Sequence, residues 1–170
     1  MKRILMLGCI VLLLCQTVAF AHEMPDEEMY ISGITVGDTL GYAKMIFGNP
    51  EQVQRQPYTE KRDIGYLYLS DGLQIRGETE WSNTIDEDDL IIWNVFANNE
   101  KWETPSGIRV GMPYTKVVEL FGEGRLMYHS HRNKPYEYKG QSKTLSIFVD
   151  PQNDLIKSIS VVKSSFGEFK

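Results

Sequence analysis

Cysteine is almost absent from this sequence. Its two cysteines, Cys9 and Cys15, both lie within the first 15 residues, and none follows. The remaining chain therefore cannot form an internal disulfide, and it has no thiol for nucleophilic catalysis. We expect the folded part to be stabilised by packing alone.

The sequence also lacks an excess of positive charge and a second long apolar run. It holds 18 lysines and arginines against 23 aspartates and glutamates, a net charge of −5. This balance argues against nucleic-acid binding, which needs a basic face, and it gives no support to docking on anionic lipid. After residue 14 no apolar stretch approaches the roughly 20 residues of a membrane-spanning helix, so we expect no transmembrane segment in the mature chain.

The first 21 residues have the order of a secretory signal peptide. Two basic residues precede an apolar run over residues 4–14, and Ala-Phe-Ala at residues 19–21 follows as a cleavage site. Cleavage near Ala21 would place the protein in the periplasm or outside the cell. It would change the net charge from −5 to −7, because the only charges lost are the two basic ones. A lipid anchor at Cys15 is the alternative, but Leu14 stands where a lipoprotein signal has a small residue.

The rest of the chain contains one motif twice. Residues 32–48, SGITVGDTLGYAKMIFG, align without a gap with residues 106–122, SGIRVGMPYTKVVELFG. Seven of the 17 aligned positions are identical, where ordinary amino-acid frequencies would give about one. We therefore predict two tandem copies of one structural unit.

Each copy of the motif predicts a short helix with one apolar side. Apolar residues at positions i, i+3 and i+4 form the same stripe twice: Ala43, Ile46 and Phe47, then Val117, Leu120 and Phe121. Asp38 suits a helix cap and Pro113 suits a first helical turn, while Gly48 and Gly122 suit a stop with positive φ. Helices of about nine or ten residues are marginal alone in water, so the stripe must pack on another element.

Three β-rich runs follow each predicted helix. In the first copy, residues 66–69 and 73–75 flank a hairpin turn at Ser70-Asp71-Gly72, and residues 90–97 form the third run. In the second copy the runs are residues 136–138, 144–149 and 155–162. The alternation of apolar residues in 144–149 is typical of a strand with one buried face.

The sequence thus predicts an α+β protein of two tandem helix-plus-three-strand repeats. Their antiparallel sheets would lie side by side, with the helices on one face and the other face partly open. The expected divisions are a signal peptide at residues 1–21, a flexible N-terminal lead at 22–31, a first repeat at 32–97, a linker at 98–105 and a second repeat at 106–170.

The string IRVGMPYTKVVELFG at residues 108–122 resembles the opening motif of the BamE family of outer-membrane assembly lipoproteins, also called the SmpA/OmlA family. That motif has a hydrophobic-x-hydrophobic-Gly-Met-Thr start, a short helix and a glycine, and a three-stranded antiparallel sheet follows it. Two such units in tandem are similar to the β-lactamase inhibitory protein-like fold. The resemblance implies this fold and protein binding without catalysis. In this sequence Asp38-Thr39 and Met112-Pro113 replace Met-Thr, and no anchoring cysteine stands at the expected mature terminus.

Few residues could carry catalysis or bind a metal. The only histidines are His22, His129 and His131, and no further residue is spaced to complete a zinc or copper site with them. Ser130 lies between two histidines, but neighbours on an extended chain point to opposite faces and no G-x-S-x-G elbow is present. The acidic run 86–89 lacks the alternation and the glycine of a calcium loop. We expect no catalytic residue, no metal and no cofactor, with an envelope hydrolase or metal-binding protein as the weaker alternative.

Aromatic and acidic residues are the candidates for contact with another protein. We expect Trp93, inside an apolar run, to lie in the core. The predicted protein-binding residues are Trp81, Trp102, Asp86, Glu87, Asp88, Tyr136 and Tyr138. The functional prediction is an exported, monomeric, non-catalytic module that binds a protein of unknown identity, as an inhibitor would, through the open sheet face and the loop 78–89. An accessory protein of the cell envelope or of outer-membrane assembly is the alternative.

Overall fold

The computed structural model describes residues 23–57, 64–78 and 86–164 of the chain. The predicted signal peptide at residues 1–21 therefore lies outside the described residues. In the described ranges no helix has both the length and the hydropathy that a membrane span requires.

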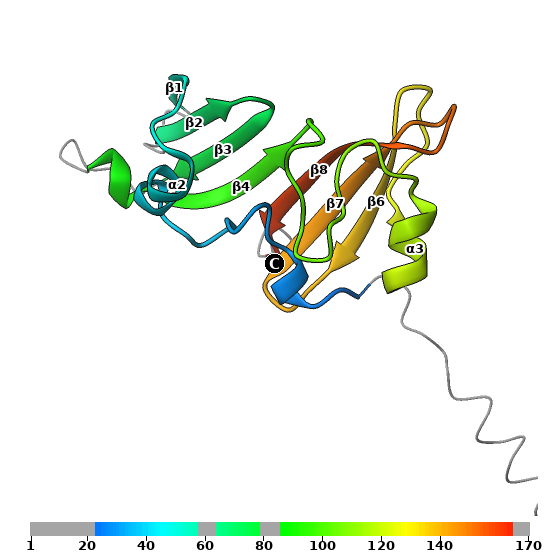
Figure 1. The fold of residues 1–170 in the computed structure, drawn as a ribbon. Coiled ribbons are helices and arrows are strands. Elements are labelled where there is room, and N and C mark those ends of the chain that lie inside the picture. The colour runs from blue at the N-terminus through cyan, green and yellow to red at the C-terminus, as the bar shows by residue number, and fades with distance from the viewer. Residues whose placement is uncertain (1–22, 58–63, 79–85, 165–170) are drawn as a thin grey trace, which may run out of the picture.

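One antiparallel sheet of eight strands runs through the molecule in the order β1-β2-β3-β4-β8-β7-β6-β5 (Figure 1). The α+β class predicted from the sequence is confirmed, but the two expected sheets are continuous because β4 pairs with β8. The strands are β1 (Gln52–Pro57), β2 (Ile64–Ser70), β3 (Leu73–Glu78), β4 (Ile91–Ala97), β5 (Arg125–Leu126), β6 (Lys134–Lys139), β7 (Lys143–Val149) and β8 (Ile156–Lys163). The helices are α2 (Leu40–Phe47) and α3 (Thr115–Phe121), with 3-10 turns η1 (Asp26–Glu28) and η2 (Glu87–Asp89).

Each helix is followed by four strands, not by the three that the sequence predicted. The additional strands are β1, which precedes the first predicted β-rich run, and β5, which has two residues. Both lie at the edges of the sheet. Their sequences, QVQRQP and RL, lack the apolar alternation of a strand with a buried face, so their pairing comes from the neighbouring strand rather than from their own pattern.

The turns before the two helices make the same backbone hydrogen bonds. The N–H of Gly37 donates to the carbonyl of Ile92 over 2.8 Å, and the N–H of Gly111 donates to the carbonyl of Ile156 over 2.8 Å. These two glycines have φ values of 96° and 85°, a region that favours glycine. Each turn is thereby fixed to the last strand of its own half.

The two halves meet at the β4–β8 pair in matching positions. Phe96 of β4 lies opposite Ser160 of β8. The next strand outward on each side continues this row: Gln74 of β3 lies opposite Phe96, and Ser146 of β7 lies opposite Ser160. The pairing register shifts two residues after each of these outer partners, at Arg76/Gly77 and at Phe148/Val149. The order of elements, the turn hydrogen bonds and the irregularities of the sheet therefore recur in both halves.

The helices pack on one face of the sheet along a narrower line than the sequence predicted. Leu40, Ala43 and Val117 are buried, and Phe47 and Phe121 are partly buried against the same core. Ile46 and Leu120, which the predicted stripe placed in the core, are 41% and 56% exposed. That part of the prediction is wrong in both copies. In α2 the core positions are Leu40, Ala43 and Phe47, at i, i+3 and i+7. In α3 they are Val117, Val118 and Phe121. Ile46 and Leu120 lie beside these positions and remain on the solvent side.

The helix stops agree with the prediction, whereas the predicted cap of α2 does not. Gly48 and Gly122 end the helices with φ of 80° and 76°. The cap of α2 is Thr39, whose side chain accepts a hydrogen bond from the N–H of Tyr42 over 3.1 Å. The carboxylate of Asp38 instead accepts from the N–H of Thr35 over 2.9 Å, so it stabilises the preceding turn.

The segment before the first repeat is packed rather than loose. Met24 and Met29 are 3% and 0% exposed and belong to the hydrophobic core. The N–H of Met24 donates to the carbonyl of Lys139 over 3.0 Å, and the carboxylate of Asp26 accepts hydrogen bonds from the N–H and Oγ of Ser142. The expected flexible lead at residues 22–31 thus lies, in its described part, against the second half of the chain. Its four acidic residues suggested a solvated segment, but its two methionines fill the core.

Candidate functional site

Strand pairing divides the side chains of the central sheet into a covered face and an open face. Residues directly opposite each other on antiparallel strands project to the same side. Residues opposite one another on β3, β4, β8 and β7 form rows across the sheet. Two of these rows are at most 1% exposed and form the core with the helices: Leu73–Ala97–Ile159–Ile147 and Ile75–Val95–Val161–Leu145. The intervening rows project to the other side. We define the open face by their partly or fully exposed side chains: Gln74, Arg76, Phe96, Ser146, Phe148, Ser158, Ser160 and Val162.

Aromatic side chains lie on the open face among small polar residues. Phe96 and Phe148 are partly exposed there, on strands either side of β8. Trp93, expected in the core, is also only partly buried, and the guanidinium carbon of Arg76 lies 5.6 Å from the centre of its ring. This difference arises because the register shift in the β3–β4 pair places Trp93 and Asn94 beside Arg76 instead of continuing strict alternation.

Asn94 fixes the centre of the open face. Its side-chain nitrogen donates to Ser160 Oγ over 2.8 Å and to the carbonyl of Val161 over 3.2 Å. Asn94 is 7% exposed, so its amide is held in one orientation by these bonds. The open face therefore combines partly exposed aromatic rings with polar atoms that hydrogen bonds hold in place, an arrangement suited to binding.

Two of the predicted protein-binding residues are buried, so those predictions are wrong. Trp102 is 5% exposed: its ring meets Phe47 edge to face with centroids 5.2 Å apart, and its Nε1 donates to the carbonyl of Asp71 over 2.7 Å. Tyr138 is 0% exposed on the covered face of β6. Both were predicted as aromatic residues that could anchor a protein interface. Burial came instead from segments far along the chain, which the local pattern does not show.

Tyrosines on the covered face form a buried hydrogen-bond chain. The N–H of Gly124 donates to the Tyr114 hydroxyl over 2.9 Å, and the Tyr138 hydroxyl donates to the carbonyl of Gly122 over 2.9 Å. The two hydroxyls lie 2.9 Å apart. Because the Tyr138 hydroxyl proton is already donated to Gly122, Tyr114 is the donor in the hydrogen bond between them. Burial raises the pKa of Tyr138 and, together with its bond to Tyr138, that of Tyr114. Tyr136, the remaining predicted tyrosine, is partly buried and stacks on Tyr114 with ring centres 4.0 Å apart.

The acidic residues predicted for binding lie on the helix side of the sheet, not on the open face. Lys44 of α2 forms ion pairs with Glu87 and Asp88 of η2, while Asp86 caps η2 by accepting from the N–H of Asp88 over 3.1 Å. The hydrogen bond from Lys44 to Asp88 is the largest cause of the raised pKa of Lys44, and the contact with Glu87 adds to it. The open sheet face and the acidic residues 86–88 are therefore two surfaces. Trp81 and residues 79–85 of the predicted loop lie outside the described residues.

Two of the three histidines lie in the segment between β5 and β6. His129 and His131 are exposed, and His22 is outside the described residues. Ser130 Oγ accepts from the N–H of Asn133 over 3.0 Å and donates to the Asn133 carbonyl over 2.9 Å, so its hydroxyl closes a local turn. No cluster of three or more metal-ligating side chains occurs in the part of the chain that the structure describes.

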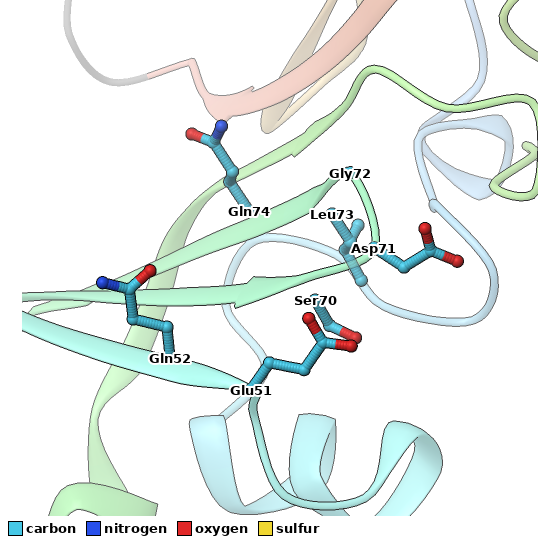
Figure 2. Close-up of a pocket in the computed structure, with 7 residues that line it drawn as sticks. All are labelled: Glu51, Gln52, Ser70, Asp71, Gly72, Leu73 and Gln74. Atoms are coloured by element: carbon cyan, nitrogen blue, oxygen red, sulfur yellow. The ribbon is translucent and has the colours of Figure 1, made fainter.

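A shallow hollow of about 360 Å³ lies at the β2–β3 hairpin (Figure 2). Glu51, Gln52, Ser70, Asp71, Gly72, Leu73 and Gln74 line it. The hairpin turn itself is formed by Asp71 and Gly72, with φ of 36° and 78°, as the sequence predicted. Asp71 is paired with Lys101 over 3.2 Å. Most of the lining residues are polar, and Leu73 is the apolar side chain among them.

Comparisons with known proteins show the fold. No protein-family model and no curated protein matches the chain. A cysteine-rich secretory protein from Staphylococcus aureus matches with a TM-score of 0.55 at 14% identity, covering 86% of this chain and 48% of its own. An extracellular protein containing an SCP domain, from Bacillus anthracis, matches with a TM-score of 0.50 at 8% identity, covering 76% of this chain and 44% of its own. The chain thus spans about half the length of these two structures.

Two further solved structures are similar at a lower level. A DUF4309 family protein from Bacillus subtilis matches with a TM-score of 0.45 at 16% identity, covering 85% of this chain and 90% of its own. A candidate beta-lactamase inhibitor protein from Streptococcus mutans matches with a TM-score of 0.31 at 16% identity, covering 75% and 90%. Both TM-scores are below 0.5, so these two structures carry no argument about this chain. None of the four is described as a BamE protein, so that resemblance stays a prediction.

Proposed function

We propose that this chain is an exported, non-catalytic module that binds a partner protein on the open face of its sheet, as an inhibitor does. The observation that carries the proposal is the placement of Phe96 and Phe148, partly exposed on the face opposite both helices. Trp93, also partly exposed, lies beside Arg76 of the same face. The order of the first 21 residues supports export. The names of two structural neighbours, secretory and extracellular, are consistent with it.

The physical basis is the rigidity of the surface. The backbone of a strand is already ordered, and an aromatic side chain has only two rotatable bonds. A partner that covers such a ring therefore gains apolar burial with little loss of conformational freedom. Burying one such ring fully contributes about 1.5–3 kcal/mol. Ser146, Ser158 and Ser160 leave room beside the rings and offer hydroxyls to the partner.

We also propose that the two halves arose by duplication, because the motif at residues 32–48 and 106–122 precedes matching strands with matching irregularities. The motif favours a second candidate function. Its resemblance to the BamE opening motif supports an accessory role in the cell envelope or in outer-membrane assembly. The inhibitor-like role and the accessory role both require protein binding, and they differ in which protein is bound.

Capture experiments with a matched variant test the proposal. Phe96 and Ser160 are opposite each other at equivalent places in the two halves, so Phe96→Ser inserts a residue that the same sheet already accepts there. We expect the tagged mature chain to capture a specific protein from envelope and culture fractions, and Phe96→Ser to weaken that affinity at least tenfold. Leu120→Ser, on the helix side, is the control and should bind normally.

The identity of the captured protein separates the two functions. A soluble enzyme whose activity falls on binding supports the inhibitor-like role, and membrane-assembly components support the accessory role. Equal capture by the wild type and by a folded Phe96→Ser variant, checked by circular dichroism, would refute the open face as the binding surface.

A further inference from the structure

The outer side of α2 is apolar although it faces solvent. Tyr42, Met45 and Ile46 are 43%, 79% and 41% exposed. They are spaced at i, i+3 and i+4, so they form one continuous patch on the helix. We call these three residues the α2 patch. Ile46 also reaches the preceding turn, where its Cδ1 lies 3.8 Å from the position that a Cβ on Gly33 would occupy.

The equivalent side of α3 shows that the fold does not require this patch. In the alignment of the two motifs, Lys116 stands at the position of Tyr42 and Glu119 at the position of Met45. Lys116 and Glu119 are exposed and form an ion pair of 2.8 Å. The third position, that of Ile46, holds Leu120, which is also exposed. The same helix in the same fold is therefore stable with two charged residues in place of Tyr42 and Met45, and the apolar area of these two side chains needs another explanation.

Negative charge borders the α2 patch. The 3-10 turn η2 packs directly against α2: a Cβ on Gly41 would lie 3.0 Å from Cβ and from the carbonyl oxygen of Asp88. Lys44, the one basic residue of α2, is engaged by Glu87 and Asp88. Asp86 and Asp89 are exposed beside them. The α2 patch is thus an apolar surface on a helix whose neighbouring turn η2 is acidic.

We propose that the α2 patch and η2 together form a second docking surface, which binds a basic amphipathic segment of a partner protein. Apolar side chains of that segment would cover Tyr42, Met45 and Ile46, while its lysines or arginines would face Asp86 and Asp89. The surface lies on the helix side of the sheet, so it is separate from the open face of the proposed function. A second copy of the chain would bring two acidic borders together, and an anionic lipid surface would be repelled.

A synthetic amphipathic peptide of leucine and lysine, helical on binding, is the probe. Its affinity is measured by fluorescence anisotropy, and its contact surface by amide chemical-shift changes in isotope-labelled protein. The test variant Tyr42→Lys/Met45→Glu copies the outer side of α3 onto α2. The control Leu120→Glu changes an exposed apolar residue on α3 itself, whose exposed fraction of 56% lies between the 43% of Tyr42 and the 79% of Met45.

The expected result is binding whose shift changes centre on residues 41–46 and 86–89, weakened at least tenfold in the double variant and less than twofold in Leu120→Glu. Replacing the lysines of the peptide by glutamate, or raising the salt to 0.5 M, should weaken binding likewise. The proposal is overturned if the double variant binds the peptide as the wild type does, or if the shifts centre elsewhere. It is equally overturned if the patch mediates self-association in sedimentation or binding to phosphatidylcholine/phosphatidylglycerol vesicles instead. Phe96→Ser should bind the peptide normally, which separates this surface from the open face.

Discussion

Replacing Tyr114 by phenylalanine should destabilise the second half without changing its shape. The ring and its stack on Tyr136 remain, so the change removes only the hydroxyl. That hydroxyl accepts from the buried N–H of Gly124 and donates to Tyr138. Leaving a buried N–H without a partner costs about 1–3 kcal/mol, and losing an ordinary hydrogen bond costs about 1 kcal/mol. We expect Tyr114→Phe to lower the free energy of unfolding by about 2–3 kcal/mol.

The companion variant Tyr138→Phe isolates the bond between the two hydroxyls. It removes the donor to the Gly122 carbonyl and the acceptor of the Tyr114 proton, and we expect a loss of about 1–2 kcal/mol. The bond between the tyrosines is lost in either single variant. The double variant should therefore cost about 1 kcal/mol less than the sum of the two single losses.

Urea unfolding followed by circular dichroism measures all four corners of this cycle. In a chain of this length 1 kcal/mol corresponds to roughly 2–4 °C in Tm, so thermal unfolding provides a second reading. Tyr128→Phe is the control, because Tyr128 is 56% exposed and its variant should lie within about 0.5 kcal/mol of the wild type. Single variants that unfold like the wild type, or losses that simply add, would contradict the hydrogen-bond chain described here.

Two predictions concern pH. Because burial raises the pKa of Tyr114 and Tyr138 above the ordinary value near 10, their contribution should be complete below pH 10 and be lost as the pH rises beyond it. Unfolding midpoints measured between pH 8 and 11 should therefore fall less steeply in the double phenylalanine variant, and parallel curves would speak against it. For Asp26, burial alone would raise the pKa, but hydrogen bonds from Ser142 and the Gln141 backbone together outweigh it and hold the pKa below its usual value. Its contribution should be present at neutral pH and be lost as the pH falls below about 4, so Asp26→Ala should cost about 1 kcal/mol at pH 7 and much less at pH 2.5. An unchanged difference between the two pH values in urea titrations would count against this contact.

The binding surface was harder to predict than the elements that carry it. Exposure of Asp86 and Asp88 followed from their charge. Trp102 was misplaced because its Nε1 bonds to the carbonyl of Asp71, 31 residues away, and Trp93 because a register shift interrupts the alternation of its strand. The open face was predicted as a feature, but which aromatic rings lie on it depends on the pairing of strands whose opposite residues are up to 68 positions apart in the sequence, as Asn94 and Val162 are.

Short-range patterns were sufficient for the local elements of this protein. The helix stops at Gly48 and Gly122 and the hairpin turn at Asp71-Gly72 depend on the φ values that these residues tolerate, and the apolar alternation of residues 144–149 depends on side-chain direction along one strand. Tertiary contacts decided the rest. The joining of β4 to β8, the edge strands β1 and β5, and the packing of Met24 and Met29 all involve segments that meet only in the folded chain. A backbone group can form its hydrogen bond with any suitable strand, and an apolar side chain can pack against any apolar surface. The local sequence of a segment therefore does not specify which other segment it will pair with or pack against.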